Sequence, residues 1–520
     1  MELSIINLIE KVKKGFIILM GLFFVIEFFF SQSWRIYIDT PFFHYGAFLF
    51  NRYHAVPYKD FFDMNMPLTY MIHLGIGKLF GYGDLAIKLI DSVLLLLLLF
   101  MMWKLMYRFG RYVALTSAVL FGIIFLGYGP SMIMQRDYLG IFPIMTSVLI
   151  AVGEIDIQKK WLRTLSIGML FGLSASIKPQ LIIGLPVILT YINWHHTDDK
   201  NENHAPLIKK ILQDHAIAMI GAAVIFSIPL LWLWSKGGLD AFIDIVINFF
   251  PLYAQVSPTH EPVTGIEKLV IIDLAIQELG TKGGLLVVAV LAVYLFLSES
   301  SKNQQKSVVY LLSALAGVYF VYPIISAKFF VYHWMPYYFF LSLLSGLIFC
   351  EYSQKHPANV RILFPLIVLI FGVFTSVNPA KEFISQLIGQ NATSLQYERI
   401  DKMANYLKQH LREGDKVQPW GRLVSGSQHA MLRAEANLAT PFPIDGSIYN
   451  FAASDYIKRI RKEYVSKMLE VKPRFILETM EPDRVSDTRT HFPELIELLR
   501  CHYKIAEAGK GYRIYELIAE

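Results

Sequence analysis

The chain has 520 residues, of which 54% are hydrophobic and only 17% are charged, and its mean hydropathy is +0.43. This composition excludes a string of soluble domains and indicates an integral membrane protein. The formal charge, 48 Lys and Arg against 42 Asp and Glu, is only +6 and is scattered along the chain, which argues against a nucleic-acid partner. The two cysteines, Cys350 and Cys501, are too few for a disulfide scaffold.

Apolar runs that can cross the hydrocarbon core of a bilayer need about 20 residues, and we predict about eleven of them. The predicted spans are Gly15–Ser33, Leu85–Tyr107, Tyr112–Tyr128, Tyr138–Gly153, Leu165–Ile177, Gln180–Trp194, Ala216–Trp234, Gly284–Leu297, Val308–Ile325, Trp334–Cys350 and Ile362–Val377. The first has a basic start like that of a signal peptide, but no small-x-small cleavage site follows it. We therefore interpret it as a membrane anchor.

Basic residues set the predicted orientation. With a cytoplasmic N-terminus, every inside connection is short and carries Lys or Arg, for example Lys104, Arg108 and Arg111 after the second span. An odd number of spans then places the chain beyond about Asn378 outside the cytoplasm. We expect a multi-pass protein of the bacterial cytoplasmic membrane with a periplasmic or extracellular C-terminal domain.

Three stretches on that outer side are long enough to hold structure: Trp34–Gly83, Lys236–Lys282 and Asn378–Glu520. The last alternates amphipathic helices with strand-like runs at 416–420 and 474–478, and it closes with a hairpin at 503–516. We predict a mainly α-helical membrane module over residues 1–377, with its first outer loop at 34–83, and a soluble α/β domain over residues 378–520.

The first outer loop carries the first acidic candidate. Asp39 directly follows the first span, where a carboxylate beside the membrane surface serves as a general base for a lipid-linked substrate. Asp39-Thr40-Pro41 is equally a good helix start with Asp39 as its N-cap, and both interpretations stay open.

A turn-rich segment further along the same loop holds Tyr58, Lys59, Asp60 and Asp63. The two acids are three residues apart, so they either share a helical face or bind a cation, or are simply solvated or capping groups. The run Leu68–Phe80 is apolar but too short to span, which indicates an interfacial helix.

Later outer connections supply further candidates. Arg136 and Asp137 lie between the third and fourth spans, either as an ion pair that anchors two helix ends or as part of a site. Lys178 lies between two short spans, where it either snorkels or meets a phosphate. The aromatic connection that contains Lys328 and His333 is either an interfacial belt or a site for a phosphate or a metal. The topology puts Asp39, Asp137, Lys178 and His333 at one membrane face.

These motifs, in this order, resemble the GT-C superfamily of polytopic glycosyltransferases, particularly the branch with protein O-mannosyltransferases and the lipid A aminoarabinose transferase. The resemblance rests on Asp39, Val56–Leu68, Gln135-Arg136-Asp137-Tyr138, Ser176-Ile177-Lys178-Pro179 and Lys328–Pro336, and it covers roughly the first 350 residues. It implies an inverting transfer of a sugar from a polyprenyl-phosphate donor to a glycan, glycolipid or protein acceptor at the outer leaflet.

By the same resemblance, Asp39 is the base for the acceptor hydroxyl and Asp137 is the second acid of the site. Arg136, Lys178, Lys328 and His333 are then expected at the donor phosphate. The chain has Asp39-Thr40 where many relatives have two adjacent acids, so a divalent metal on Asp39, Asp137 and His333 is possible but is not assigned.

A lipid or sugar transporter, or flippase, is the main alternative. Transporters place ionisable residues near the bilayer midplane within repeated halves, and no repeat is evident here. Glu27 and Asp91 are the most nearly intramembrane acids, and a central cavity lined by both would favour transport. An O-antigen ligase or polymerase is a second alternative, but such enzymes usually carry their large outer loop between late spans.

Overall fold

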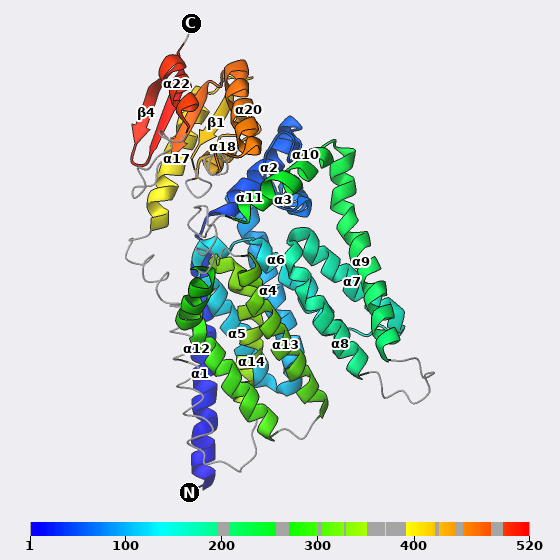
Figure 1. The fold of residues 1–520 in the computed structure, drawn as a ribbon. Coiled ribbons are helices and arrows are strands. Elements are labelled where there is room, and N and C mark those ends of the chain that lie inside the picture. Colours follow the sequence, from blue (N-terminus) through cyan, green and yellow to red (C-terminus); the bar gives the residue numbers. More distant parts are fainter. Residues whose placement is uncertain are drawn as a thin grey trace. The chain divides into compact units, whose positions relative to one another are not determined.

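The computed structural model describes residues 2–195, 207–255, 270–299, 303–326, 329–350, 370, 392–421, 426–443, 451–479 and 492–518 (Figure 1). The chain divides into two compact units. The first unit comprises Met1–Trp34, Leu89–Ser227 and Ile266–Ser385, and the second comprises Arg35–Lys88, Ile228–Gly265 and Gln386–Glu520. The predicted domain boundary after residue 377 lies outside the described residues and stays a prediction.

The first unit is helical. Its long helices are α1 (Glu2–Ser31), α4 (Asp84–Met106), α5 (Arg111–Gly127), α6 (Arg136–Ala151), α7 (Lys160–Ile177), α8 (Leu185–His195), α9 (Leu207–Ser235), α12 (Val270–Glu299), α13 (Asn303–Ser326) and α14 (Met335–Gly346). The first turn of α4 and the last turns of α9 belong to the second unit. Helix α14 packs against α5, α12 and α13, and α6 packs against α7 (Figure 1).

The predicted spans agree with these helices in position. Ten of the eleven coincide with described helical segments, while Ile362–Val377 lies outside the described residues except for residue 370. Within the described residues, four helical stretches are long and apolar enough to cross a membrane: Lys11–Ser31, Asp84–Phe109, Lys209–Ser235 and Asn303–Ile325. The protein is therefore mainly α-helical with membrane-length helices, and the number eleven remains a prediction.

Helices α7 and α9 approach each other through small residues. A Cβ atom added to Gly168 would lie 2.0 Å from the carbonyl oxygen of Ala218, and one added to Gly172 would lie 2.4 Å from that of Ala222. Gly221 of α9 meets the carbonyl oxygen of Leu165 at 2.5 Å in the same way. Small residues of this kind let two helix backbones approach closely where the hydrophobic effect does not drive association.

We therefore expect Gly168→Leu to separate α7 from α9 and to lower the melting temperature of the purified protein. The cost should be at least the roughly 1–3 kcal/mol of an overpacked core, because backbone blocks the added side chain. Gly317→Leu is the matched control, since Gly317 lies on α13 with open space around it. Equal melting temperatures for the two variants would contradict this close packing.

The second unit combines helices with a five-stranded sheet. Its strands are β1 (Lys416–Trp420), β2 (Asn437–Leu438), β3 (Phe475–Thr479), β4 (Tyr503–Gly509) and β5 (Tyr512–Leu517), in the order β2-β1-β3-β5-β4. The first three strands pair in parallel, and the pairs β3–β5 and β4–β5 are antiparallel. The helices in the same C-terminal part of the chain are α17 (Ala392–His410), α18 (Ser427–Arg433), α20 (Asp455–Val471) and α22 (Pro493–His502). The predicted strands and closing hairpin are confirmed, whereas β2 was not predicted.

The first outer loop belongs to this unit and packs on the sheet-bearing part. It forms α2 (Asp39–Tyr53) and α3 (Pro67–Phe80), so the predicted helix over Leu68–Phe80 is present. The Phe62 amide donates to the Pro441 carbonyl at 2.6 Å, and the Tyr45 hydroxyl donates to the Ala436 carbonyl at 3.0 Å. From the second outer stretch, α10 (Leu239–Asp244) supplies Asp244, which pairs with Arg459 at 2.7 Å. The segments predicted to lie on the outer side thus pack with the C-terminal part in the second unit.

A pair of buried histidines joins α2 to α3. The Nδ1 atoms of His44 and His73 lie 3.4 Å apart, and both side chains are fully buried. Burial lowers the pKa of His44 to about 4 against the partly opposing charge of Asp84, with a smaller contribution from His429. Burial and the neighbouring His44 also hold the pKa of His73 well below its usual range. Both imidazoles are therefore neutral at pH 7.

This pair predicts a loss of stability in mild acid. The unfolded chain takes up a proton on each imidazole below about pH 6.5, whereas folded His44 does so only near pH 4, so the free energy of unfolding falls as the pH drops through that window. For His44 alone the full effect is about 3 kcal/mol. Thermal unfolding from pH 7 to 4.5 should show a shallower pH dependence for His44→Gln than for the parent protein. His410→Gln, at an exposed site on α17, should leave the slope unchanged; equal slopes for all three would contradict this account.

Candidate functional site

A buried ion pair lies where α6 begins and α7 ends. Both carboxylate oxygens of Asp137 accept hydrogen bonds from Nζ of Lys178 at 2.9 Å, and the Tyr322 hydroxyl of α13 donates to the same carboxylate. The side chain of Asp137 is fully buried, and Lys178 is nearly so. Lys178 ends its helix because Pro179 follows it, which forces an extended backbone and turns the side chain back toward α6. Helices α6, α7 and α13 thus meet at this buried ion pair.

Aromatic side chains surround the Lys178 ammonium. Its Nζ lies 5.3 Å from the ring centroid of Tyr322 and 5.5 Å from that of Tyr332, both within the range of cation–π attraction. His333, also buried, packs edge-on against the same two tyrosines, with ring centroids 4.8 Å from Tyr332 and 5.9 Å from Tyr322. Asp137, Lys178 and His333, predicted separately from three connections, therefore lie together in the first unit.

The segment before α6 is held in a strained conformation by Asp91 of α4. Met134 has a positive φ of 53°, which is uncommon for a residue with a side chain, and its amide donates to the Asp91 carboxylate at 2.9 Å. The next residue, Gln135, is the N-cap of α6 and is buried, and its side-chain amide has no hydrogen-bond partner among the described residues. Arg136 then starts α6, half-buried. Asp91 therefore orients the turn that presents Gln135, Arg136 and Asp137.

Asp39 begins α2 in the second unit. It is the first helical residue and is buried at 6% exposure, while the N-cap position is occupied by Ile38. The sequence therefore located the helix start correctly but placed the cap one residue late. Ile38 has φ 54° and ψ −111°, a conformation that a β-branched residue rarely adopts and that costs of the order of 1–3 kcal/mol. Such strain persists only where its surroundings enforce it.

Arg35 provides that restraint. Its Nε donates to Asp84 at 3.0 Å, and its Nη1 pairs with Asp401 of α17 at 3.1 Å. The guanidinium lies over the ring of Tyr397 at 4.8 Å, and the Tyr397 hydroxyl donates to the Arg35 carbonyl at 3.1 Å. The segment that leads into Asp39 is thus fixed by side chain and backbone to the C-terminal part.

The other candidates of the first outer loop have structural contacts. They lie in an irregular segment between α2 and α3, so Asp60 and Asp63 do not share a helical face. The Asp60 carboxylate accepts the Val56 amide at 2.9 Å, and the buried Asp63 accepts the Tyr70 hydroxyl and the Asn65 amide at 2.7 Å each. Tyr58, buried with φ 71°, donates to the Asn65 carbonyl, and Lys59 is exposed. Asp60 therefore caps a turn through a backbone amide, whereas Asp63 is buried and is bound by two side chains, so it is not solvated.

Lys328 lies outside the described residues, so its place at the site stays a prediction. Within the described part of the chain, no group of three or more His, Cys, Asp or Glu side chains is arranged to hold a metal ion. Asp39 belongs to the second unit, and Asp137, Lys178 and His333 to the first. The structure therefore brings together three of the four residues that the topology placed at one face.

Several residues of these arrangements were not singled out from the sequence. Tyr322 and Tyr332 are two tyrosines among many in apolar or aromatic runs, and nothing in their spacing marks them. Gln135 was part of a motif but had no assigned role. Arg35 was visible as the first basic residue after the first span, yet its partner Asp401 is 366 residues away, a pairing that only the fold reveals.

Comparisons with known proteins identify the fold. No family model matches the sequence, and no curated protein matches it. Among solved structures, ArnT from Cupriavidus metallidurans bound to undecaprenyl phosphate has a TM-score of 0.61 at 12% identity, covering 97% of this chain and 98% of ArnT. ArnT in the apo state gives a TM-score of 0.55 at the same identity, covering 96% and 98%. The resemblance to the GT-C superfamily is thereby confirmed at the level of the fold.

The Asp137–Lys178 pair predicts non-additive mutant stabilities. Lys178→Met leaves a buried carboxylate without its cation, and Asp137→Asn leaves a buried ammonium, so each should destabilise the protein by about 3–5 kcal/mol. The double variant removes both charges and should regain much of that loss. Melting temperatures of the four proteins close this double-mutant cycle. Additive losses would show that the two groups do not depend on each other.

Proposed function

We propose that the protein is a membrane glycosyltransferase that moves a sugar from a polyprenyl-phosphate donor to a glycan, glycolipid or protein acceptor of the cell envelope, at the outer face of the cytoplasmic membrane. The observation that carries the proposal is the buried cluster of Asp137, Lys178, Tyr322 and His333 at the helix ends of a GT-C fold. The ArnT structure is bound to undecaprenyl phosphate, which is a polyprenyl phosphate.

The charges of the cluster suit a departing phosphate. Arg136 and Lys178 place two cations near the N-terminus of a 16-residue helix, whose dipole also favours an anion. As the sugar–phosphate bond breaks, negative charge grows on the phosphate, and fixed cations lower that barrier. We assign Arg136, Lys178, His333 and Lys328 to the donor phosphate, with Gln135 as a further donor of hydrogen bonds.

Within this proposal, Asp39 is the general base. Its carboxylate takes the proton of the acceptor hydroxyl while that oxygen attacks the anomeric carbon from the side opposite the phosphate. The bond from the anomeric carbon to the phosphate oxygen breaks, polyprenyl phosphate leaves, and the configuration inverts. Support comes from the burial of Asp39 and from the strained, clamped segment that presents it. No step requires a metal, although a divalent ion remains a possible addition.

The transport alternative receives no support from the two intramembrane acids. Asp91 holds the Met134 amide, and Glu27 is buried on α1. Neither lines the cleft between α2, α17 and α18 nor the small pocket around Ile38. Asp91 instead orients the turn before Asp137, which is a structural role within the proposed site.

The proposal predicts that a deletion strain lacks one sugar on an envelope product and that Asp39→Asn does not restore it. Without the carboxylate, the acceptor hydroxyl keeps its proton, so transfer should fall by at least the roughly 10²–10⁴-fold that general-base catalysis supplies. The measurement is mass spectrometry of envelope glycolipids, glycans and glycoproteins. Asp455→Asn, at an exposed position on α20, is the matched control and should restore the product.

Two results would contradict the assignment. Full restoration by Asp39→Asn, at an expression level equal to the parent protein, would remove Asp39 as the base. An unchanged set of envelope glycans in the deletion strain, together with altered lipid translocation, would favour the flippase.

A further inference from the structure

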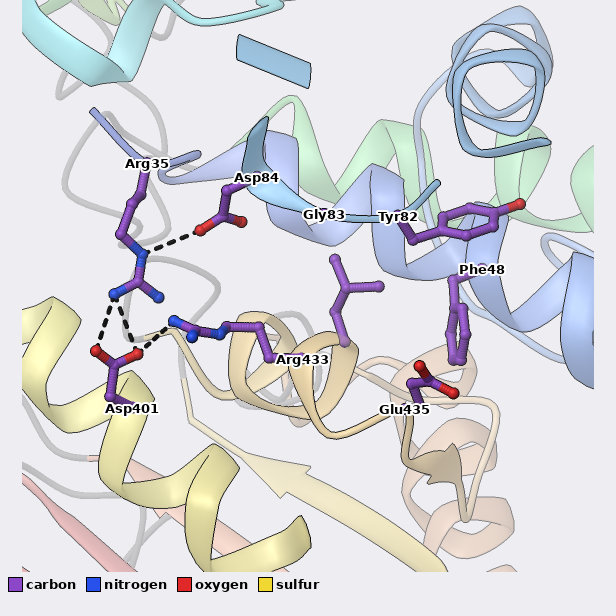
Figure 2. Close-up of a pocket in the computed structure, with 9 residues that line it drawn as sticks. Arg35, Phe48, Tyr82, Gly83, Asp84, Asp401, Arg433 and Glu435 are labelled. Atoms are coloured by element: carbon purple, nitrogen blue, oxygen red, sulfur yellow. Dashed lines mark hydrogen bonds and ion pairs between the residues drawn. The ribbon is translucent and has the colours of Figure 1, made fainter. Parts of the chain in front are cut away.

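A cleft of about 620 Å³ opens within the second unit, and none of the residues assigned to the donor lines it (Figure 2). Its walls come from α2, from the Tyr82–Asp84 segment that leads into α4, from α17, and from the end of α18. The lining residues are Arg35, Phe48, Tyr82, Gly83, Asp84, Asp401, Leu432, Arg433 and Glu435. The volume lies within the range of about 300–1,000 Å³ typical of sites for small ligands.

The two ends of the cleft differ in chemistry. Figure 2 shows Arg35, Asp84, Asp401 and Arg433 at one end and Phe48, Tyr82 and Glu435 at the other. At the charged end, Arg35 pairs with Asp84 and Asp401, and Arg433 pairs with Asp401 as well. At the aromatic end, the rings of Phe48 and Tyr82 pack edge to face with centroids 5.5 Å apart.

Polar side chains line both ends of this cleft. The Arg35 side chain lines the charged end and is 20% exposed, and its buried Nη2 atom has no hydrogen-bond partner among the described residues. The Glu435 side chain is exposed at the opposite end. Its backbone has a positive φ of 52°, and its carbonyl accepts the Tyr53 hydroxyl at 2.8 Å, so α2 fixes the turn that carries it.

The net charge of the lining decides against an anionic ligand. Two guanidiniums face three carboxylates, which sum to −1, and the Asp84 partner His429 raises this sum only to 0 if it is protonated. The guanidiniums are already engaged by carboxylates, so a phosphate or uronate would find no net attraction. Hydroxyl groups suit the site better, because they accept from Arg35 and donate to Glu435, while the apolar face of a sugar ring packs on Phe48 and Tyr82.

We propose that this cleft binds an uncharged oligosaccharide portion of the acceptor. The inference rests on the proposed function, which it deepens by naming the class of acceptor. Arg35, at the charged end of the cleft, lies four residues before Asp39. A glycan bound there would therefore contact the same restrained segment that carries the proposed base.

Ligand-observed saturation-transfer NMR on the full-length protein in lipid nanodiscs tests the proposal without any donor. The probes are triacetylchitotriose and maltotriose, which are neutral, and trigalacturonate, which carries three carboxylates. We expect saturation transfer to at least one neutral trisaccharide and none to trigalacturonate. Glu435→Gln should weaken neutral binding by roughly tenfold, because a hydrogen bond to a charged group is lost.

Charge reversal gives the sharper test. Glu435→Lys changes the lining from −1 to +1 and should create binding of trigalacturonate. Glu413→Gln, at an exposed site after α17, is the matched control and should bind as the parent does. Because Glu435 is exposed, both variants should keep the parent melting temperature, which confirms that they fold.

Three results would overturn the proposal: no binding of either neutral trisaccharide, equal binding of trigalacturonate by the parent, or neutral binding that Glu435→Gln leaves unchanged. Its failure can be distinguished from failure of the proposed function. If the protein binds a neutral trisaccharide but the deletion strain keeps all its envelope glycans, only the transferase proposal is contradicted. If the deletion strain lacks the sugar but the protein binds no trisaccharide, only the proposal about the cleft is contradicted.

Discussion

The ion pair between Asp137 and Lys178 is the interaction on which the first unit's site depends. A buried carboxylate or ammonium loses several kcal/mol of hydration, and that loss is offset only by close pairing and further hydrogen bonds. Here both carboxylate oxygens bind the ammonium at 2.9 Å, and Tyr322 donates to the same carboxylate. Such a pair adds little stability relative to an apolar core of the same shape. The proposed role at the donor phosphate would account for this cost.

A comparable constraint governs the approach to Asp39. Ile38 adopts a backbone conformation that is unfavourable for its side chain, and it does so next to a buried carboxylate. The flanking segment is restrained on one side by the ion pairs and ring contact of Arg35 and on the other by α2, whose Tyr45 reaches Ala436. The C-terminal part thus restrains the segment that leads into Asp39, because it supplies Asp401 and Tyr397 as the partners of Arg35.

Much of the fold was predictable because it follows from local pattern. Apolar runs of span length predicted the helices, and alternating short runs predicted β1, β3 and the β4–β5 hairpin. Asp137, Lys178 and His333 were predictable as a group because each lies at a connection on the same side of the topology. Strand β2 was missed because two residues carry no periodic signal, and Tyr322 because tyrosine is common throughout the apolar runs. The pairing of Arg35 with Asp401 depends on a contact across most of the chain, which no local pattern contains.

Under the proposed function, the charges in the two units would keep the two substrates apart. In the first unit, Lys178 and Arg136 are the cations that the proposal assigns to a lipid phosphate, whose negative charge grows during the reaction. The cleft lined by Arg35 and Glu435 sums to −1, although it too contains two arginines, because each arginine is matched by carboxylates. A phosphate-bearing donor is therefore attracted to the first unit and gains nothing in the second, whereas an uncharged glycan loses little by entering the cleft. Under the proposal, the carboxylates that match both arginines would thus keep the donor headgroup from occupying the place of the acceptor.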